Sequence, residues 1–406
     1  KVPRLIRDYI SFLLTDEEKI NIYKMACDLY LGLDWRNSIK FIQPKDAELD
    51  LIIYQNLQIA IQFILSYGIK TNNSLEIRRM TQVSTSLVEN FERKGAYKDA
   101  VSLTEVTLTL IKDVDIEDFD KARVHLTKSL GENLRMTSFH DKSISILKSI
   151  CDDENNSLSR EDRNDIRLSI AYAYLSQRNE NESIKYANLI KKNEPKKKSS
   201  IYLSAEHVIA QFNPDKVEKI RALKSIKSKA EKAGFHTLKA NITFNLCSLE
   251  MGESQIKHLD KIIIESKNDI YNKVRALVVK TDIVLQTKNI EEITNDDLFG
   301  LNVAYSYTFY QRLLLLLDKC HNLAWKYWVK QNRYDQLLNL FRYSSFVWRL
   351  CGAPQEEKEY LDILYNDSIF QEWFKVNREG VNSSYFAQRV LALYNNSKID
   401  SIIKLE

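Results

Sequence analysis

The stretch 84–112, which reads STSLVENFERKGAYKDAVSLTEVTLTLIK, decides the fold. Apolar residues recur at helical spacing on both sides of Gly95-Ala96-Tyr97: Leu87, Val88 and Phe91 before it, and Ala100, Val101 and Leu108 after it. Residues three and four apart share one face of a helix, and glycine is common just beyond a helix end. The stretch therefore predicts two amphipathic helices joined by a tight turn.

This unit resembles the tetratricopeptide (TPR) repeat, in which a small residue ends the first helix and an aromatic residue starts the second. The template fits again at Leu130, Gly131, Leu134, Ser143, Ile144 and Leu147, then at Ile170, Ala171, Tyr174, Ser183, Ile184, Ala187 and Ile190, and near the C-terminus at Ala324, Trp325, Trp328, Asn332, Tyr334, Leu337, Leu338 and Phe341. Equating Tyr97, His140 and Glu180 gives spacings of 43 and 40 residues. Both exceed the usual repeat of about 34 residues, so we expect long, irregular helical pairs.

Glycine and proline are scarce, with 9 Gly and 5 Pro among 406 residues. These residues supply the corners of β-hairpins and Gly-rich loops, so a chain this poor in them is predicted to be all-α. The predicted fold is a right-handed superhelical solenoid of TPR-like hairpins with an aromatic-rich C-terminal cap.

Four regions are expected along the chain. Residues 1–45 would hold the end of a winged-helix-like segment and the first helices, 46–198 TPR-like repeats, 199–297 degenerate helical repeats, and 298–406 aromatic-rich repeats and the cap. In the third region we expect helices near 199–212, 215–233, 236–250, 254–267 and 270–287. The fourth holds four of the five tryptophans, at 325, 328, 348 and 373. These aromatic residues either seal the end of the solenoid or form a binding surface.

Near the N-terminus, Thr15 and Glu18 have the spacing of a capping box ahead of an apolar run, which predicts a helix over 16–31. Together with the preceding Leu5-Ile6-Arg7-Asp8-Tyr9-Ile10, this arrangement resembles the junction of STAND NTPases at which a winged-helix segment meets a TPR array. Pro3 and Arg4 stand where the family commonly has His. The junction and the long TPR-like array together are similar to the antiviral STAND proteins of bacteria. The stretch 340–349 also resembles a segment in the C-terminal regions of such proteins.

That resemblance implies the C-terminal sensor part of a signalling ATPase. In this family the array binds a phage protein such as a terminase or portal subunit, and binding lets the ATPase oligomerise and switches on a fused effector. ATP and Mg²⁺ would bind a nucleotide-binding domain outside this segment. The segment itself would hold no cofactor. The first residue is Lys1 rather than Met, so we also expect a longer parent polypeptide.

Other features exclude several function classes. A net charge of +4 argues against a nucleic-acid partner, and apolar runs such as 313–317 are too short to cross a bilayer. Five scattered cysteines indicate free thiols in the cytoplasm. No phosphate-binding loop, nucleophile elbow or H-E-x-x-H motif is present, so we expect no enzyme and no metal site. The six histidines (125, 140, 207, 236, 258 and 321) are interpreted as surface or interhelical hydrogen-bonding residues, and the lysines at 191–198 as a solvated loop.

A partner is expected on the surface lined by the first helix of each pair. The predicted inward positions are Gln82, Thr85, Glu89, Glu92 and Arg93; His125, Lys128, Glu132 and Arg135; and Asp165, Leu168, Tyr172 and Leu175. From these and the C-terminal aromatic region, the partner-binding candidates are His125, Lys128, Arg135, Leu168, Tyr172, Trp325, Trp328 and Arg342. Leu168 and Tyr172 could equally pack between helices.

The leading hypothesis is a non-catalytic sensor that recognises a phage protein, with a homo-oligomer of the parent after activation. The alternative is the TPR sensor of a STAND-type transcriptional regulator that binds a small effector or a regulatory protein. A third hypothesis is an enzyme with a hydrolytic site assembled across helices.

Overall fold

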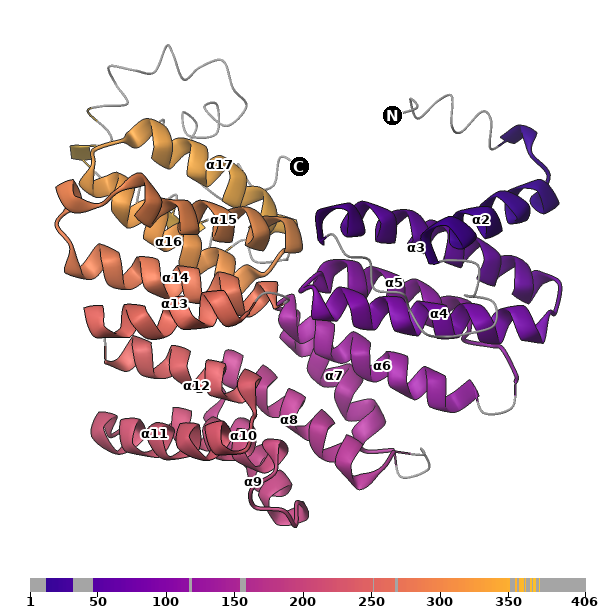
Figure 1. The fold of residues 1–406 in the computed structure, drawn as a ribbon, viewed down its shortest axis with the longest axis horizontal. Helices are drawn as coiled ribbons and strands as arrows, with labels where there is room; N and C mark the ends of the chain where they lie inside the picture. The colour runs from indigo at the N-terminus through magenta and orange to yellow at the C-terminus, as the bar shows by residue number, and fades with distance from the viewer. Residues whose placement is uncertain are drawn as a thin grey trace. The chain divides into compact units, whose positions relative to one another are not determined.

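The computed structural model describes residues 12–31, 47–116, 119–153, 158–250, 252–266 and 269–350, with scattered residues between 355 and 372. Within these residues the chain is all-α and contains no strand (Figure 1). The α-helices are α2 (Asp16–Leu31), α3 (Ala47–Lys70), α4 (Ser74–Arg93), α5 (Tyr97–Leu110), α6 (Phe119–Met136), α7 (His140–Cys151), α8 (Arg160–Ser176), α9 (Glu180–Asn193), α10 (Ser200–Gln211), α11 (Lys216–Lys232), α12 (His236–Leu249), α13 (Ile256–Glu265), α14 (Ile270–Thr287), α15 (Asn295–Gln311), α16 (Leu314–Lys330) and α17 (Tyr334–Leu350). Short 3₁₀ turns, η2 (Glu253–Gln255) and η3 (Ile290–Glu292), lie between them.

The predicted repeat register is confirmed. The three positions equated in the sequence, Tyr97, His140 and Glu180, are the first residues of α5, α7 and α9. The fourth unit is the pair α16–α17, whose second helix begins at Tyr334. Each pair is a helical hairpin, and successive hairpins pack on one another, so the fold is a helical-repeat solenoid.

One turn geometry recurs between helices. In the described chain every residue with positive φ stands two positions before a helix start: Asn72, Gly95, Ser138, Arg178, Gly234, Arg312 and Asn332. At each turn the next N–H donates to a carbonyl five residues back, as from Ala96 to Phe91 (2.8 Å) and from Asn179 to Tyr174 (2.9 Å). This is the Schellman arrangement, which satisfies carbonyls that the ending helix leaves free. Only two of the seven turns use glycine, so the geometry was only partly visible in the sequence.

Two hairpins are also joined by a buried hydroxyl. The Ser143 Oγ donates to the Gly131 carbonyl (2.6 Å), and the Ser183 Oγ donates to the Ala171 carbonyl (2.8 Å). In both cases the serine lies twelve residues after its acceptor, so the same hydrogen bond recurs at the equivalent place of two hairpins. A Cβ on Gly131 would lie 2.5 Å from Leu147 Cγ, which explains why this position of the second hairpin is glycine.

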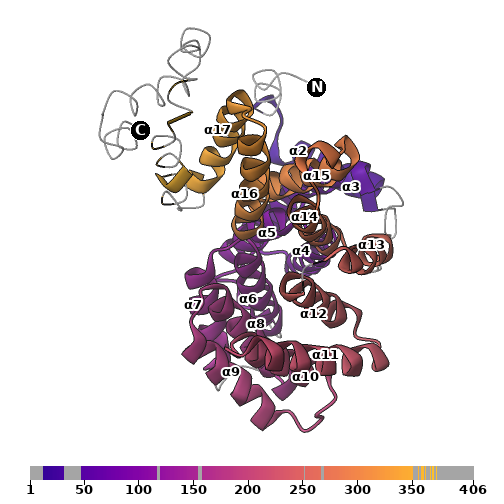
Figure 2. The same ribbon diagram turned by 90° about the vertical axis from the view of Figure 1, so that its left-hand side faces the viewer.

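The chain divides into two compact units, residues 1–242 and 243–406, and the division falls within α12. In the first unit, one apolar core runs from α2 to α6 and another from α7 to α10. Figure 2 shows α6, α8 and α10 of this unit following one another in order. In the second unit, a core of buried residues gathers from α14, α15 and α16.

The finer predictions can be compared with the helices. Thr15 and Glu18 form the expected capping box: the Thr15 N–H donates to Glu18 Oε2 (2.8 Å) and the Glu18 N–H donates to Thr15 Oγ1 (3.3 Å). The five helices expected between 199 and 287 are α10 to α14, each within two residues of its predicted ends. Cys27, Cys151, Cys247 and Cys320 are buried free thiols, as expected. Cys351, Trp373 and residues 1–11 lie outside the described residues.

Candidate partner-binding surface

The first helices of consecutive hairpins in the first unit, α4, α6, α8 and α10, pack side by side. Polar side chains bridge them at a nearly constant sequence separation of 37 or 41 residues. We call this set the polar ladder: Glu92 of α4, Lys128, Ser129, Glu132 and Asn133 of α6, and Asp165 and Ser169 of α8. The same separation of 37 residues recurs from α4 to α6 and from α6 to α8, so the ladder follows the hairpin repeat.

The first rung is centred on Glu92. Its Oε1 accepts from the Ser129 hydroxyl (2.7 Å) and from the Asn133 amide (2.6 Å). The Asn133 amide also donates to the Ser129 carbonyl (2.8 Å), and Asn133 is only 1% exposed. A carboxylate that accepts two hydrogen bonds from a neighbouring helix fixes the register of the two hairpins.

The second rung joins α6 to α8. The Ser169 hydroxyl donates to Glu132 Oε1 (3.1 Å), and the Lys128 ammonium pairs with the Asp165 carboxylate. Burial raises the pKa of Glu132 to about 7, helped by the carboxylates of Asp165 and Glu92 and opposed by Lys128 and Arg135. Burial lowers the pKa of Lys128, but Glu132 and Asp165 outweigh it, so this pKa is raised and the lysine stays charged. The rung therefore holds a protonatable carboxyl beside a fixed positive charge.

The third contact continues to α10 through an aromatic side chain. The Arg135 guanidinium lies 5.7 Å from the centroid of the Tyr172 ring, and the Tyr172 hydroxyl lies 3.4 Å from His207 Nδ1. His207 Nε2 lies 2.9 Å from the Gln211 amide nitrogen. Tyr172 and Leu168 are partly buried and pack against the core of α7 to α10. They therefore pack between helices and also keep part of their surface accessible.

Exposed groups lie along the same helices. His125 Nε2 lies 3.7 Å from Glu89 Oε1, and both side chains are about half exposed (50% and 45%). Gln82 and Arg93 of α4 are exposed as well. The structure thus brings together five of the eight predicted binding residues, His125, Lys128, Arg135, Leu168 and Tyr172, on two adjacent helices.

The other three candidates lie in the second unit. Trp325 is 6% exposed, which leaves little of its ring for a partner to touch. Trp328 is partly exposed; it packs edge-on to Tyr327 (4.8 Å), and the Arg333 guanidinium lies 5.9 Å from its ring centroid. Arg342 lies on α17, and its side chain is not among those described.

Trp325 belongs to what we call the aromatic cluster: His321, Trp325, Trp348 and Tyr360. The His321 ring lies 4.8 Å from Trp348 and 4.1 Å from Tyr360, and Trp348 and Tyr360 are stacked at 5.1 Å. His321 Nδ1 lies 2.6 Å from the Ser344 hydroxyl, which makes it the interhelical hydrogen-bonding residue that was expected. Burial lowers the pKa of His321 to about 3, so the ring is neutral at pH 7.

His140 does not follow that expectation. Among the described residues neither ring nitrogen has a hydrogen-bond partner, and both are buried. Burial, followed by the charge of Arg135, lowers its pKa and favours the neutral ring. His140 therefore behaves as a packing residue at the start of α7.

Two kinds of site are not seen in the part of the chain that the structure describes. No group of three or more His, Cys, Asp or Glu side chains is placed to hold a metal ion. No described helix is both long and apolar enough to span a bilayer.

Comparison with known proteins identifies no family: no family model and no curated protein matches the chain. Among solved structures, the chain is similar to one described as a circular tandem repeat protein with novel repeat topology and enhanced subunit contact surfaces. That similarity has 14% identity and a TM-score of 0.18, over 96% of this chain and 84% of the other. At that score the match carries no argument, and the fold rests on the helices themselves.

Sequence reasoning identified the charged members of the polar ladder but missed Ser129, Asn133 and Ser169. These residues are short and polar within amphipathic helices, so they look like ordinary surface positions. Their signal is a carboxylate on the preceding hairpin, 37 residues before Ser129 and Ser169 and 41 residues before Asn133, and it becomes visible only when the register is fixed.

Proposed function

We propose that the chain is a protein-binding helical-repeat array and that its partner docks on the first-helix face of the first unit. The observation that carries the proposal is the set of half-exposed charged and aromatic side chains around the polar ladder. His125 pairs with Glu89, and Arg135 lies over the ring of Tyr172, on helices that the ladder holds in register. A pre-ordered surface loses less conformational entropy on binding than a mobile one.

The surface has mixed charge, and this feature bears on the kind of partner. Carboxylates and cations alternate along it, as in Glu89 with Arg93 and Asp165 with Lys128. Such a surface favours a folded protein with complementary charges, whereas an acidic tail would need several unpaired cations.

Beyond this, we propose that the array is the sensor of a STAND-type signalling ATPase in antiviral defence, located in the cytoplasm. The support is the sequence: the N-terminal junction around Thr15 and Glu18, the TPR-like units, and the lack of catalytic motifs. In this proposal the partner is a phage structural or packaging protein such as a terminase or portal subunit, and the segment itself is not an enzyme. ATP and Mg²⁺ would bind a nucleotide-binding domain of a longer parent, which then assembles into a homo-oligomer.

A direct binding experiment tests the proposal. The purified chain is mixed with purified terminase, portal and capsid proteins, and affinity is measured by interferometry. The double variant Glu89→Ala/His125→Ala removes an exposed pair that bridges two first helices, and we expect at least about tenfold weaker binding. The matched control is Glu105→Ala/Lys142→Ala, which removes an exposed pair (2.6 Å) bridging the second helices α5 and α7. The control should bind like the natural chain.

Each outcome has a consequence. Equal loss in both double variants would contradict docking on the first-helix face. Failure of every phage structural protein to bind would contradict the antiviral proposal. Specific binding of a small effector or a host regulatory protein in their place would favour the transcriptional-regulator alternative.

A further inference from the structure

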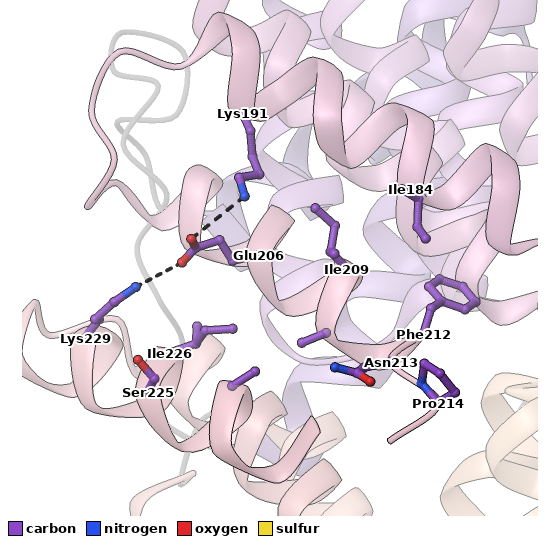
Figure 3. A pocket seen from close by; sticks show the side chains of 12 residues that line it. Ile184, Lys191, Glu206, Ile209, Phe212, Asn213, Pro214, Ser225, Ile226 and Lys229 are labelled. Carbon is purple, nitrogen blue, oxygen red and sulfur yellow. Dashed lines mark hydrogen bonds and ion pairs between the residues drawn. The ribbon is translucent and has the colours of Figure 1, made fainter. Parts of the chain in front are cut away.

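A second surface of the first unit lies away from the polar ladder. Helices α9, α10 and α11 line an open groove of about 600 Å³ (Figure 3). Its apolar side chains come from all three helices and from the α10–α11 turn: Ile184, Ile209, Ala210, Phe212, Pro214, Ala222 and Ile226. Ser225 and Asn213 complete the wall. A groove with this lining can accept one or two large apolar side chains.

One end of the groove is charged. Glu206 of α10 lies between two lysines: Lys229 Nζ is 3.2 Å from Glu206 Oε2, and Lys191 Nζ is 4.0 Å from Glu206 Oε1 (Figure 3). The side chains of Lys191 and Lys229 are 32% and 48% exposed. One carboxylate therefore faces two ammonium groups, and one positive charge at the rim remains uncompensated within this trio.

The surrounding segment strengthens this field. Residues 191–232 contain twelve Lys or Arg and five Asp or Glu, a net charge of +7, whereas the whole chain carries +4. The rest of the chain is thus net negative. Positive charge concentrated beside a low-dielectric groove attracts anionic groups and orients them toward the groove.

We propose that this groove binds an acidic amphipathic segment of a protein partner. Its apolar side chains would lie among Ile209, Phe212 and Ala222, and its carboxylates beside Lys191 and Lys229. A nucleic-acid backbone would use the lysines but leave the apolar wall unfilled, and the groove thus favours a peptide over a phosphate polymer. The site supplies the basic clamp that the first-helix face lacks, and it does not depend on the function proposed for that face.

The test uses the full chain and defined probes. A fluorescent acidic 18-residue peptide carries Leu and Phe at positions i, i+3, i+4 and i+7 with Glu and Asp elsewhere, and binding is followed by anisotropy. A second peptide has Gln in place of every acidic residue. We expect the acidic peptide to bind, to weaken with rising salt, and to lose at least about tenfold in affinity when its carboxylates become amides.

Two pairs of variants on exposed residues of α11 locate the site. Ser225→Glu places a negative charge in the groove wall, whereas Ser228→Glu makes the same charge change outside it. Lys229→Gln removes a rim ammonium, whereas Lys232→Gln removes one that does not line the groove. We expect a loss of about tenfold for Ser225→Glu and about fivefold for Lys229→Gln, and less than about twofold for both controls.

Three outcomes would overturn the proposal. The acidic peptide could fail to bind, the controls could weaken it as much as the groove variants, or single-stranded DNA or vesicles of anionic lipid could bind through the same residues more tightly than the peptide. Circular dichroism of each variant checks that the helices are retained.

Discussion

The polar ladder and the aromatic cluster hold helical hairpins together by different means. In the ladder, partly exposed charged groups meet short polar side chains, as Glu92 meets Ser129 and Asn133. In the aromatic cluster, buried rings pack around a neutral imidazole, and His321 is 0% exposed. The ladder repeats with the hairpins and leaves groups that a partner can reach, whereas the cluster closes its surface. The same hairpin architecture therefore tolerates both partly exposed polar contacts and buried aromatic contacts between its helices.

The largest expected effect is an opposite pH dependence of the two regions. His321 has a pKa of about 3 in the folded state against 6.5 when unfolded, so the unfolded chain binds the extra proton between these values. Its contribution is fully present above pH 6.5 and is lost as pH falls toward 3, by up to about 5 kcal/mol. Glu132 has a pKa of about 7 against 4.5 when unfolded, so its contribution is present below pH 4.5 and is lost as pH rises through 7.

Urea unfolding between pH 4 and 8 checks this opposition in His321→Gln and Glu132→Gln. Tryptophan fluorescence reports on five tryptophans, among them Trp325 and Trp348 of the cluster, and circular dichroism reports on the whole chain. In the natural chain, His321 adds unfolding free energy as pH rises from 4, and His321→Gln should abolish this rise. Glu132 costs about 3 kcal/mol of unfolding free energy as pH rises through 7, and Glu132→Gln should abolish this loss. Parallel pH profiles for both variants and the natural chain would show that neither His321 nor Glu132 contributes a pH-dependent free energy of unfolding.

The next effect concerns the close approach of helices. A Cβ at Gly131 would meet Leu147 Cγ and Cδ2 at 2.5 Å, whereas one at Gly300 in the second unit would meet the end of Leu277, Cδ2, at 2.9 Å. Gly131→Ala should cost about 1–3 kcal/mol of unfolding free energy, and Gly300→Ala less, because a terminal methyl can move aside. Gly68→Ala is the control. Its Cβ would lie 3.4 Å from the nearest side-chain atoms, and alanine has the higher helix propensity, so this variant should not be destabilised. Equal costs at Gly131 and Gly300 in thermal unfolding would show that the two units tolerate crowding alike.

A smaller effect measures the first rung of the ladder. Asn133→Ala should cost about 1–2 kcal/mol, because it removes a buried amide that donates to Glu92 and to the Ser129 carbonyl. Combining it with Glu92→Ala in a double-mutant cycle should give a coupling energy of about 1 kcal/mol. A coupling energy near zero would mean that the contact between Glu92 and Asn133 does not stabilise the packing of α4 on α6.

The hairpin register was predictable because its signal is large and local. Tyr97, His140 and Glu180 stand at helix starts, and apolar residues at helical spacing surround each of them. The α9–α11 groove was not predictable in the same way. Its wall combines Ile184, Ile209 and Ile226 from three helices, and each reads as an ordinary core residue in the sequence. The sequence predicts a solvated loop for the lysines at 191–198. Residues 196–198 are exposed outside a helix, as predicted, but Lys191 and Lys192 belong to α9, and Lys191 lies beside Glu206.

The aromatic cluster was predictable in composition but not in detail. Four tryptophans in the last hundred residues indicated dense packing, yet the same residues fitted a binding surface. The burial of Trp325 and Trp348 depends on Tyr360, which reaches them from a segment without a repeat signature. This contact does not recur in the other described hairpins, so no periodic signal in the sequence announces it.

The smallest expected effect is a gain in stability at the turns, and it treats both units alike. Arg178 (φ 58°) and Arg312 (φ 54°) occupy the left-handed region in the first and second units, where a side chain costs about 1 kcal/mol relative to glycine. Arg178→Gly and Arg312→Gly should each raise the unfolding free energy by about 0.5–1 kcal/mol, whereas Gly95→Ala (φ 68°) should lower it by about 1 kcal/mol. Asn332→Gly should change little, since asparagine tolerates this conformation. If Arg178→Gly destabilised the chain in thermal melts while Arg312→Gly stabilised it, the arginine of the first unit would be making a contact worth more than its backbone strain, and the shared turn geometry would not imply a shared energetic role.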